Sequence, residues 1–373
     1  MIPIKKIFLT DEDIKSAEEV LRSGWLMQGK KVKTLEENFA AYTKSKFAAA
    51  CTNGTSALHL ALEALELKPG SKVIVPSFSW ISTANAVLYA NLEPVFCDIE
   101  LDDFNISIPE LEKIISPEIK AIIPVHQFGN PAKMKNITAL AKKHGIKIIE
   151  DAACAMDAKE GETYAGTIGD IGTFSFHPRK AITSGEGGMI LTQNEAIEKN
   201  LKTLRNHGFD DTACEDEFEI SGKFTHLGYN YRMTDIQAAL LDSQLKRAKK
   251  MHEMRQEIAK QYTEKLQKIN WLKLPQEIPG TTHGWQSYVC IVKAVEPTLE
   301  NTDKNKRLRD KMIKALEAAG IQTRFGSLAI HAVKYYAARY GYKPGSYPNS
   351  YIAQQTSIAL PIYDTLTTSE VEY

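Results

Sequence analysis

A short polar turn near the start of the sequence has the composition of an anion site. Residues 53–56 read Asn-Gly-Thr-Ser and follow an apolar run at 47–51. A glycine permits close backbone approach, and a helix that begins at Thr55 and Ser56 would direct free N–H groups and its dipole at a phosphate. An ordinary helix N-cap is the alternative, because serine and threonine are common there.

Two further residues have charges that could act on a cofactor. Asp151 follows the apolar strand pattern at 147–150, and strand ends of this kind face the ligand crevice in open parallel sheets. Its carboxylate could pair with a cationic ring nitrogen, or simply cap the strand. Lys180 lies between an apolar stretch and the glycine cluster at 185–188. A desolvated lysine loses its proton more easily and attacks carbonyls; the alternative is a surface lysine beside a turn.

The order of these features is more specific than any one of them. A phosphate cradle, a strand-end carboxylate and a pocket lysine are what a pyridine phosphate carrying an aldehyde would require. Trp80 could stack on such a ring, although aromatics at helix starts usually belong to the core. His177 and His207 could transfer protons or merely pack. Asn230 and Arg232, which precede a long helical pattern, could contact anions or lie on the surface.

The elements that must position these residues alternate between strand and helix. Apolar runs predict strands at residues 47–51, 72–76, 94–97, 120–124, 147–150, 173–176 and 189–192. Helical patterns separate most of them, which indicates βαβ units and a mostly parallel sheet.

The pattern changes after Thr234. Thr234 and Gln237 predict a capping box for one long helix that reaches the 260s. A strand at 288–292 and a helix closed by Gly320 follow. We therefore expect a large α/β domain at 1–245 and a smaller α+β domain at 246–373.

Composition excludes several classes of protein. The 373 residues include 46 Lys+Arg and 46 Asp+Glu, a formal net charge of zero, so no basic excess indicates a nucleic-acid binder. No apolar run approaches the roughly 18 residues of a membrane helix, and no signal peptide is visible; we expect a cytoplasmic protein. The five cysteines are widely spaced and predict neither disulfides nor a metal site.

Taken together, the motifs make the chain similar to a known family. It resembles the DegT/DnrJ/EryC1/StrS family of pyridoxal phosphate (PLP)-dependent sugar aminotransferases. The matching segments are residues 24–29, 53–56, 76–85, 125–129, 150–153, 175–180, 185–188, 228–232 and 360–361. The resemblance implies the fold type I architecture of aspartate aminotransferase, with a large PLP-binding domain and a small C-terminal domain.

The resemblance also implies roles for individual residues. Lys180 would bind the cofactor covalently, Asp151 would pair with its pyridinium nitrogen, and Trp80 would stack on its ring. Phosphate contacts would come from Thr55, Ser56 and Ser175. Asn230 would contact the phosphate of the cofactor that is bound in the partner subunit. The resemblance therefore implies a homodimer with its active site at the interface. Substrate-side positions would be Trp25, Arg232 and His331.

The implied reaction is a two-stage transamination. An amino acid, expected to be L-glutamate, would leave its amino group on the cofactor as pyridoxamine 5′-phosphate. A nucleotide-linked 3- or 4-keto-6-deoxyhexose would then accept it, in amino-sugar or surface-polysaccharide biosynthesis. Alternatives are an aminotransferase for a cyclitol or another ketone and a non-catalytic PLP-binding regulatory protein. Related sugar dehydratases replace the lysine with histidine, which Lys180 argues against.

Three positions depart from the family pattern. Cys154 stands where the family usually has glutamine or histidine near the phenolic oxygen of the cofactor, and a thiol is a weaker donor. Gly326–His331 replaces a Pro-Leu-His motif, which changes the expected sugar pocket. The sequence ends at Tyr373, where a last helix would begin, and we expect a trimmed or disordered terminus there.

Overall fold

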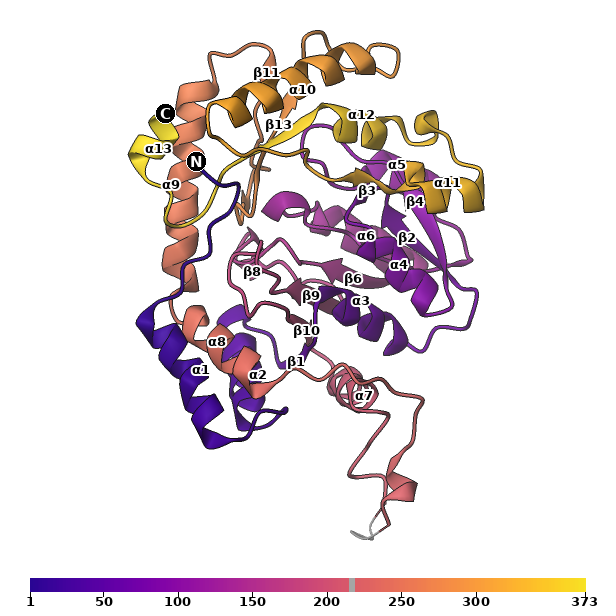
Figure 1. Cartoon of the computed structure of the whole chain (residues 1–373). Helices are drawn as coiled ribbons and strands as arrows, with labels where there is room; N and C mark the ends of the chain where they lie inside the picture. The colour runs from indigo at the N-terminus through magenta and orange to yellow at the C-terminus, as the bar shows by residue number, and fades with distance from the viewer. Residues whose placement is uncertain (215–218) are drawn as a thin grey trace.

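A seven-stranded sheet forms the centre of the protein, in a computed structural model that describes residues 1–214 and 219–373 (Figure 1). The strand order is β1-β10-β9-β6-β5-β2-β4. These strands are β1 (Phe47–Cys51), β2 (Lys72–Pro76), β4 (Glu93–Cys97), β5 (Ile119–Ile122), β6 (Lys147–Asp151), β9 (Ile171–Ser175) and β10 (Gly188–Thr192). β10 runs antiparallel to both of its neighbours, and the other pairings are parallel. The expected mostly parallel sheet is confirmed.

Helices cover both faces of this sheet. They are α1 (Asp11–Ser23), α2 (Lys30–Thr43), α3 (Gly54–Glu63), α4 (Ser82–Tyr89), α5 (Ile108–Ile114), α6 (Met134–His144), α7 (Glu195–Arg205) and α8 (Asp235–Leu245). Successive side chains of a strand point to opposite faces: Ala49 and Cys51 of β1 join the core with α3, whereas Ala48 and Ala50 join the core with α2 and α8. Strands buried on both faces read as continuous apolar runs, which explains why the sequence pattern located them.

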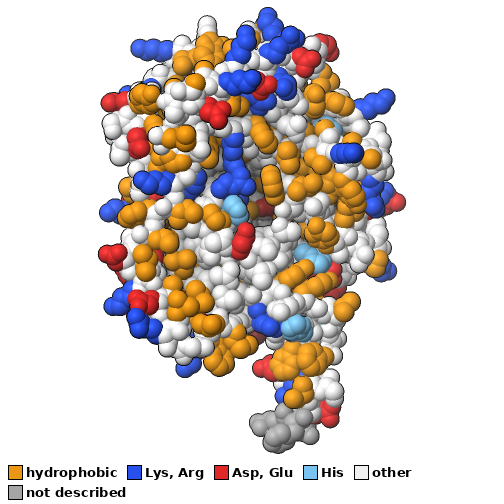
Figure 2. Space-filling model, in the orientation of Figure 1, with side chains coloured by type: hydrophobic (Ala, Val, Ile, Leu, Met, Phe, Trp, Pro, Cys, Tyr) orange, Lys and Arg blue, Asp and Glu red, His pale blue; other side chains and the backbone are white. Residues whose placement is uncertain are grey.

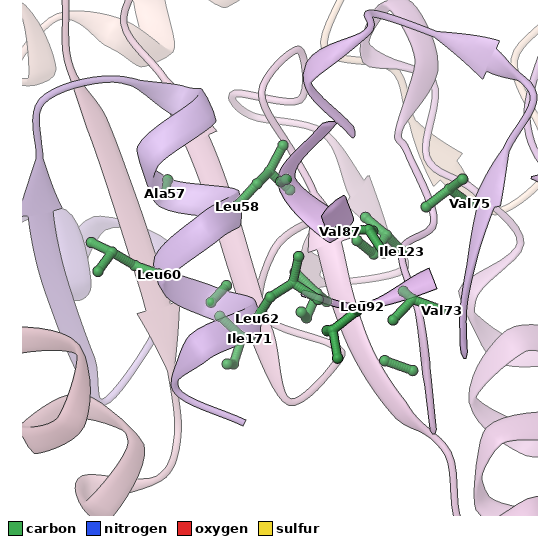
Figure 3. Packing of buried hydrophobic residues seen from close by; sticks show 14 of the residues in the cluster. Ala57, Leu58, Leu60, Leu62, Val73, Val75, Val87, Leu92, Ile123 and Ile171 are labelled. Atoms are coloured by element: carbon green, nitrogen blue, oxygen red, sulfur yellow. The ribbon is translucent and has the colours of Figure 1, made fainter. Parts of the chain in front are cut away.

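The core beneath α3 fixes the helix whose first turn faces the candidate site. Leu58 and Leu62 of α3 are almost fully buried and lie on the side facing Val87 and Leu92 (Figure 3). Burying one leucine side chain contributes about 1.5–3 kcal/mol, so the position of α3 on the sheet is well determined.

The region after Thr234 differs from the expected single helix. The capping boxes of Thr10 with Asp13 and of Thr234 with Gln237 are both present. However, α8 ends at Leu245 and a separate α9 (Ala248–Leu266) follows, because Arg247 has non-helical dihedrals (φ −113°, ψ 5°). The prediction of one continuous helix is wrong.

A second core lies above the large sheet in Figure 1. It is built from α9, a sheet of order β11-β13-β15 and further helices. The elements of this part are β11 (Leu272–Lys273), β13 (Tyr288–Val292), α10 (Thr302–Ala318), α12 (Pro348–Thr356), β15 (Ser357–Leu360) and α13 (Thr368–Glu372). In contrast, α11 (Lys334–Tyr340) packs through Tyr336 and Tyr340 on the core that contains α3. Ile2 packs against this second core, and the domain boundary near residue 245 stays a prediction.

Short strands link the two parts of the molecule. β14 (Leu328–Ala329) pairs with β3 (Phe78–Ser79), and β12 (Thr281–Thr282) pairs with β7 (Lys159–Glu160), which pairs with β8 (Thr163–Tyr164).

The last segment forms a helix, so the expectation of a disordered terminus is wrong, while that of a trimmed terminus stays a prediction. Thr367 caps α13 through a capping box with Glu370. Among the helices that the structure describes, none combines the length and the apolar character needed to span a membrane.

Candidate active site

The carboxyl ends of the parallel strands open into a cavity of ≈ 700 Å³. Asn53 follows β1, Asp151 ends β6 and Ser175 ends β9, and all three line it. The sequence-predicted residues that line the cavity are Thr55, Ser56, Trp80, Asp151, Cys154, Ser175, His177 and Lys180. Figure 2 shows a hollow on this face of the molecule, with Lys and Arg side chains gathered above it.

The first turn of α3 forms one wall of the cavity. Asn53 caps the helix, its Oδ1 accepting from Ser56 N at 2.9 Å. The Thr55 hydroxyl donates to Ser82 Oγ at 3.0 Å. A Cβ at Gly54 would lie only 2.8 Å from Cβ of Ser175, so glycine lets the first turn of α3 lie this close to the end of β9. The N–H groups at the start of a helix have no partner within it, and together with the hydroxyls they form a cradle suited to a phosphate.

Asp151 is held rigidly at the end of β6. It is 5% exposed, and its two oxygens accept from Thr83 Oγ1 at 2.9 Å and from Ala153 N at 3.2 Å. Neighbouring Glu150 points to the opposite face, where it accepts from Gly166 N at 2.8 Å and contacts His126 Nε2 at 2.9 Å. Glu150 thus anchors the strand end while Asp151 directs a carboxylate into the cavity.

Lys180 is half-buried in the turn that follows β9. Its Nζ donates to Cys154 Sγ at 3.1 Å. The structure therefore places Cys154 beside the lysine amine, in the same cavity as Asp151. The Lys180 amine thus lines the same cavity as the Asp151 carboxylate, where a lysine amine can attack a bound carbonyl.

Positive charge dominates one side of the cavity. Arg179 and Arg324 line it together with Lys180, and the Arg179 guanidinium lies 5.9 Å from the ring centroid of Trp80. Burial lowers the pKa of His177, and the charges of Arg179, Lys180 and Arg324 lower it further against the opposing effect of Glu186. The neutral form of His177 is therefore favoured.

Five sequence-predicted residues lie outside the cavity of their own chain. Trp25 is 56% exposed, and Asn230 is exposed beside Asn206, with which it forms a β-bridge. Arg232 donates to Asn206 Oδ1 at 2.7 Å. His331 is fully buried, with its Nε2 3.2 Å from the Pro344 carbonyl oxygen. His207 is not among the lining residues either.

Several residues of the cavity escaped the sequence analysis. Thr83 and Ser82 lie inside the matched segment at 76–85, so their hydroxyls could have been singled out there. Arg179 directly precedes Lys180 and lies inside the matched segment at 175–180, so it could have been singled out in the same way. Arg324 had none, because it enters the cavity through a long-range pairing, in which Ala359 N donates to its carbonyl oxygen at 2.7 Å.

Comparison with known proteins assigns the family. The model of the DegT/DnrJ/EryC1/StrS aminotransferase family matches residues 8–373. The chain belongs to this family. It is therefore an enzyme of the aminotransferase class with the fold type I architecture, as the sequence predicted.

Relatives of the chain act in sugar biosynthesis. The spore coat polysaccharide biosynthesis protein SpsC of Bacillus subtilis is 34% identical over 100% of this chain and 94% of its own length. PseC of Helicobacter pylori, an aminotransferase involved in pseudoaminic acid biosynthesis, superposes with a TM-score of 0.91 at 26% identity, covering 100% of this chain and 96% of PseC. A putative sugar aminotransferase of Streptococcus pneumoniae, Spr1654, was solved in a PLP form, with a TM-score of 0.89, 26% identity and coverage of 100% and 96%.

Proposed function

We propose that this chain is a PLP-dependent aminotransferase that transfers the amino group of L-glutamate to a nucleotide-linked 3- or 4-keto-6-deoxyhexose. The observation that carries the proposal is the meeting of Lys180, Asp151 and the first turn of α3 in one cavity. The sugar class is supported by the relatives, which include a polysaccharide biosynthesis protein and an amino-sugar aminotransferase.

The residues of the cavity fit the cofactor. Thr55, Ser56 and Ser175 surround the open space beside Gly54 and would hold the phosphate. Trp80, 55% exposed on the cavity wall, would cover the ring. Asp151 would pair with the ring nitrogen, because hydrogen bonds from Thr83 Oγ1 and Ala153 N hold its carboxylate at the cavity.

Lys180 carries out the steps that belong to the protein. Its Nζ would hold the cofactor covalently, and it would become a free amine once the amino donor has taken its place. The freed amine then removes the proton from the α-carbon of the donor and returns a proton on the cofactor side, a positioned transfer worth about 10²–10⁴-fold. When bound, PLP supplies the carbonyl and the electron-accepting ring that this chemistry requires.

Cys154 acts next to this amine. Its thiol accepts a hydrogen bond from Lys180 Nζ, so it would hold the amine in place between turnovers. A role near the phenolic oxygen of the cofactor, as the family position implies, stays part of this proposal.

We further propose a homodimer with shared active sites. Asn230 is exposed and does not line the cavity of its own chain, as expected of a residue that serves a partner. Trp25, which is exposed, and Arg232, which is half-buried, do not line it either and would contact the substrate in the partner. Large apolar side chains are also exposed near the N-terminus, a surface that a partner would cover: Ile7, Phe8, Leu9, Trp25, Leu26 and Met27. The five free cysteines agree with action in the cytoplasm.

A half-reaction tests the proposal without knowledge of the sugar. The PLP-loaded protein is mixed with L-glutamate, and the absorbance of the cofactor is followed as 2-oxoglutarate forms. We expect conversion to the pyridoxamine form in the absence of any sugar. A regulatory protein would retain PLP without converting it, and that result would exclude the aminotransferase. A panel of nucleotide keto-sugars, with products read by mass, then distinguishes sugars from cyclitols and other ketones.

A further inference from the structure

Two arginines in the cavity have no carboxylate partner in the part of the chain that the structure describes. Neither Arg179 nor Arg324 forms a salt bridge within residues 1–214 and 219–373. The Nε of Arg324 is buried without a hydrogen-bond partner. A buried unsatisfied polar group costs about 1–3 kcal/mol, more when it is charged, so the protein holds this guanidinium in place at the expense of stability.

The two guanidinium groups are held from different parts of the chain. Arg179 comes from the turn that carries Lys180, and its carbonyl oxygen accepts a hydrogen bond from Gln286 Nε2. Arg324 comes from the second core, through its pairing with Ala359. Both line the cavity of Lys180, and both also line a small neighbouring recess beside Gln286. The charge of Arg179, added to burial, lowers the pKa of Arg324, which places the two groups within electrostatic reach of each other.

We propose that Arg324 and Arg179 together bind the α-carboxylate of the amino donor and of the 2-oxo acid formed from it. The assignment rests on the proposed aminotransferase function and names the contact that selects its donor. Guanidinium groups match the geometry of carboxylates and bind them through paired hydrogen bonds. A carboxylate between them supplies the missing partner of Arg324.

The position of the pair favours a carboxylate over the diphosphate of a nucleotide sugar. The α-carboxylate of an amino acid is attached to the same carbon as the reacting amine, so it must be bound close to Lys180. Arg179 adjoins Lys180 in the chain, and Arg324 lies close enough to Cys154 for the charge of that thiol to affect its pKa. The thiol itself is 3.1 Å from Lys180 Nζ. A diphosphate is separated from the keto carbon of its sugar by the hexose ring and would be bound farther away.

The glutamate half-reaction measures the contribution of each arginine. In the PLP-loaded protein, Arg324→Gln and Arg179→Gln should each raise the half-saturating concentration of L-glutamate about tenfold or more, because each removes a charge-assisted hydrogen bond. The limiting rate should change much less, since the carboxylate is bound equally before and during the reaction. Arg324→Lys should recover only part of the affinity, because it keeps the charge but not the paired donors.

Two controls separate binding from folding. Arg307→Gln changes an exposed arginine of α10 outside the cavity and should leave the half-reaction unchanged. Arg179 has an exposed side chain, so its variant should keep the wild-type thermal midpoint even if Arg324→Gln packs less well.

Binding without turnover gives a second readout. Titration calorimetry with 2-oxoglutarate, which carries no amine to donate, should show affinity for the wild type that falls about tenfold in either glutamine variant. UDP, GDP and dTDP are titrated in parallel. If the variants lose affinity for a nucleoside diphosphate and keep their affinity for 2-oxoglutarate, the pair binds the diphosphate and this assignment is overturned.

The outcomes also distinguish this inference from the proposed function. A wild type that does not convert glutamate would overturn the donor, and the assignment with it. A wild type that converts glutamate, with variants of unchanged half-saturation, would overturn the arginine assignment alone.

Discussion

The two walls of the cavity are built in different ways. The sheet-end wall consists of residues at or just after the ends of strands of the central sheet: Asn53–Ser56, Asp151 and Ser175. The C-terminal wall consists of Arg324–Ser327, which reach the cavity from the second core. Strand pairing fixes the first wall, whereas pairing between Arg324 and Ala359, far apart in the chain, fixes the second. We infer that the first wall serves the cofactor and the second the substrates.

The largest effect is expected at Lys180, in the turn that follows β9 beside the sheet-end wall. Lys180→Ala should abolish the glutamate half-reaction, because proton transfer alone contributes roughly 10²–10⁴-fold and the nucleophile is lost as well. Borohydride reduction followed by peptide mapping should label Lys180 in the wild type. Lys33→Ala, on the exposed face of α2, is the matched control. Wild-type rates in Lys180→Ala would remove this lysine from the mechanism.

A smaller but still large effect is expected at the end of β6. Asp151→Asn keeps the shape of the side chain and can still accept from Thr83, but it loses the charge that would hold a proton on the ring nitrogen. The rate of the half-reaction should fall roughly 100-fold or more. Stopped-flow absorbance would measure this, with Asp102→Asn, at an exposed surface pair with Lys273, as control. An unchanged rate would show that Asp151 serves only the strand end.

A moderate effect is expected at Asn230, which belongs to neither wall of the cavity of its own chain. Asn230→Ala should weaken PLP retention about tenfold, because Asn230 would contact the phosphate of the partner subunit. Mixing this variant with Lys180→Ala subunits sharpens the test. Each hybrid dimer would contain one complete site, with Lys180 from one chain and Asn230 from the other, so retention at that site should return to normal. No recovery after proven subunit exchange would contradict the shared site.

The last effect concerns the pH dependence of stability rather than activity, and it lies outside both walls. His283 accepts a hydrogen bond from Trp285 N at 2.8 Å and stacks on the Trp285 ring. Burial, aided by the charge of His252, lowers the pKa of His283 to about 3. In the unfolded chain His283 binds a proton near its ordinary pKa of 6.5. The stabilisation that the neutral, buried His283 contributes to the folded state is therefore complete above pH 6.5. It is lost as the pH falls toward the folded value, by at most about 1.4 kcal/mol per pH unit.

Urea unfolding at a series of pH values would measure this dependence. His283→Asn keeps an acceptor and does not titrate, so it should flatten the loss between pH 6 and pH 4. His144→Asn, at the exposed end of α6, should retain the wild-type slope. Equal slopes in the wild type and His283→Asn would mean that other groups cause the acid sensitivity.

The sheet-end wall was predictable from the sequence, and the C-terminal wall was not. Apolar runs buried on both faces located the strands, so Asp151 and the turn at Asn53 were found from local pattern. Arg324 has no such local signal, because its place depends on a pairing with Ala359. The break between α8 and α9 was also missed, because the helical pattern continues through Arg247 while its backbone does not.

The alternation at the end of β6 has a consequence for how this enzyme can vary. Glu150 supports the loop at Gly166 on one side of the sheet, and Asp151 serves the cavity on the other. Because side chains alternate with a period of two, inserting or deleting one residue within β6 would exchange these positions. The Asp151 carboxylate would then point away from the cavity, and the loop at Gly166 would lose the carboxylate that anchors it. Evolution can therefore exchange apolar residues along this strand far more freely than it can change the strand's length.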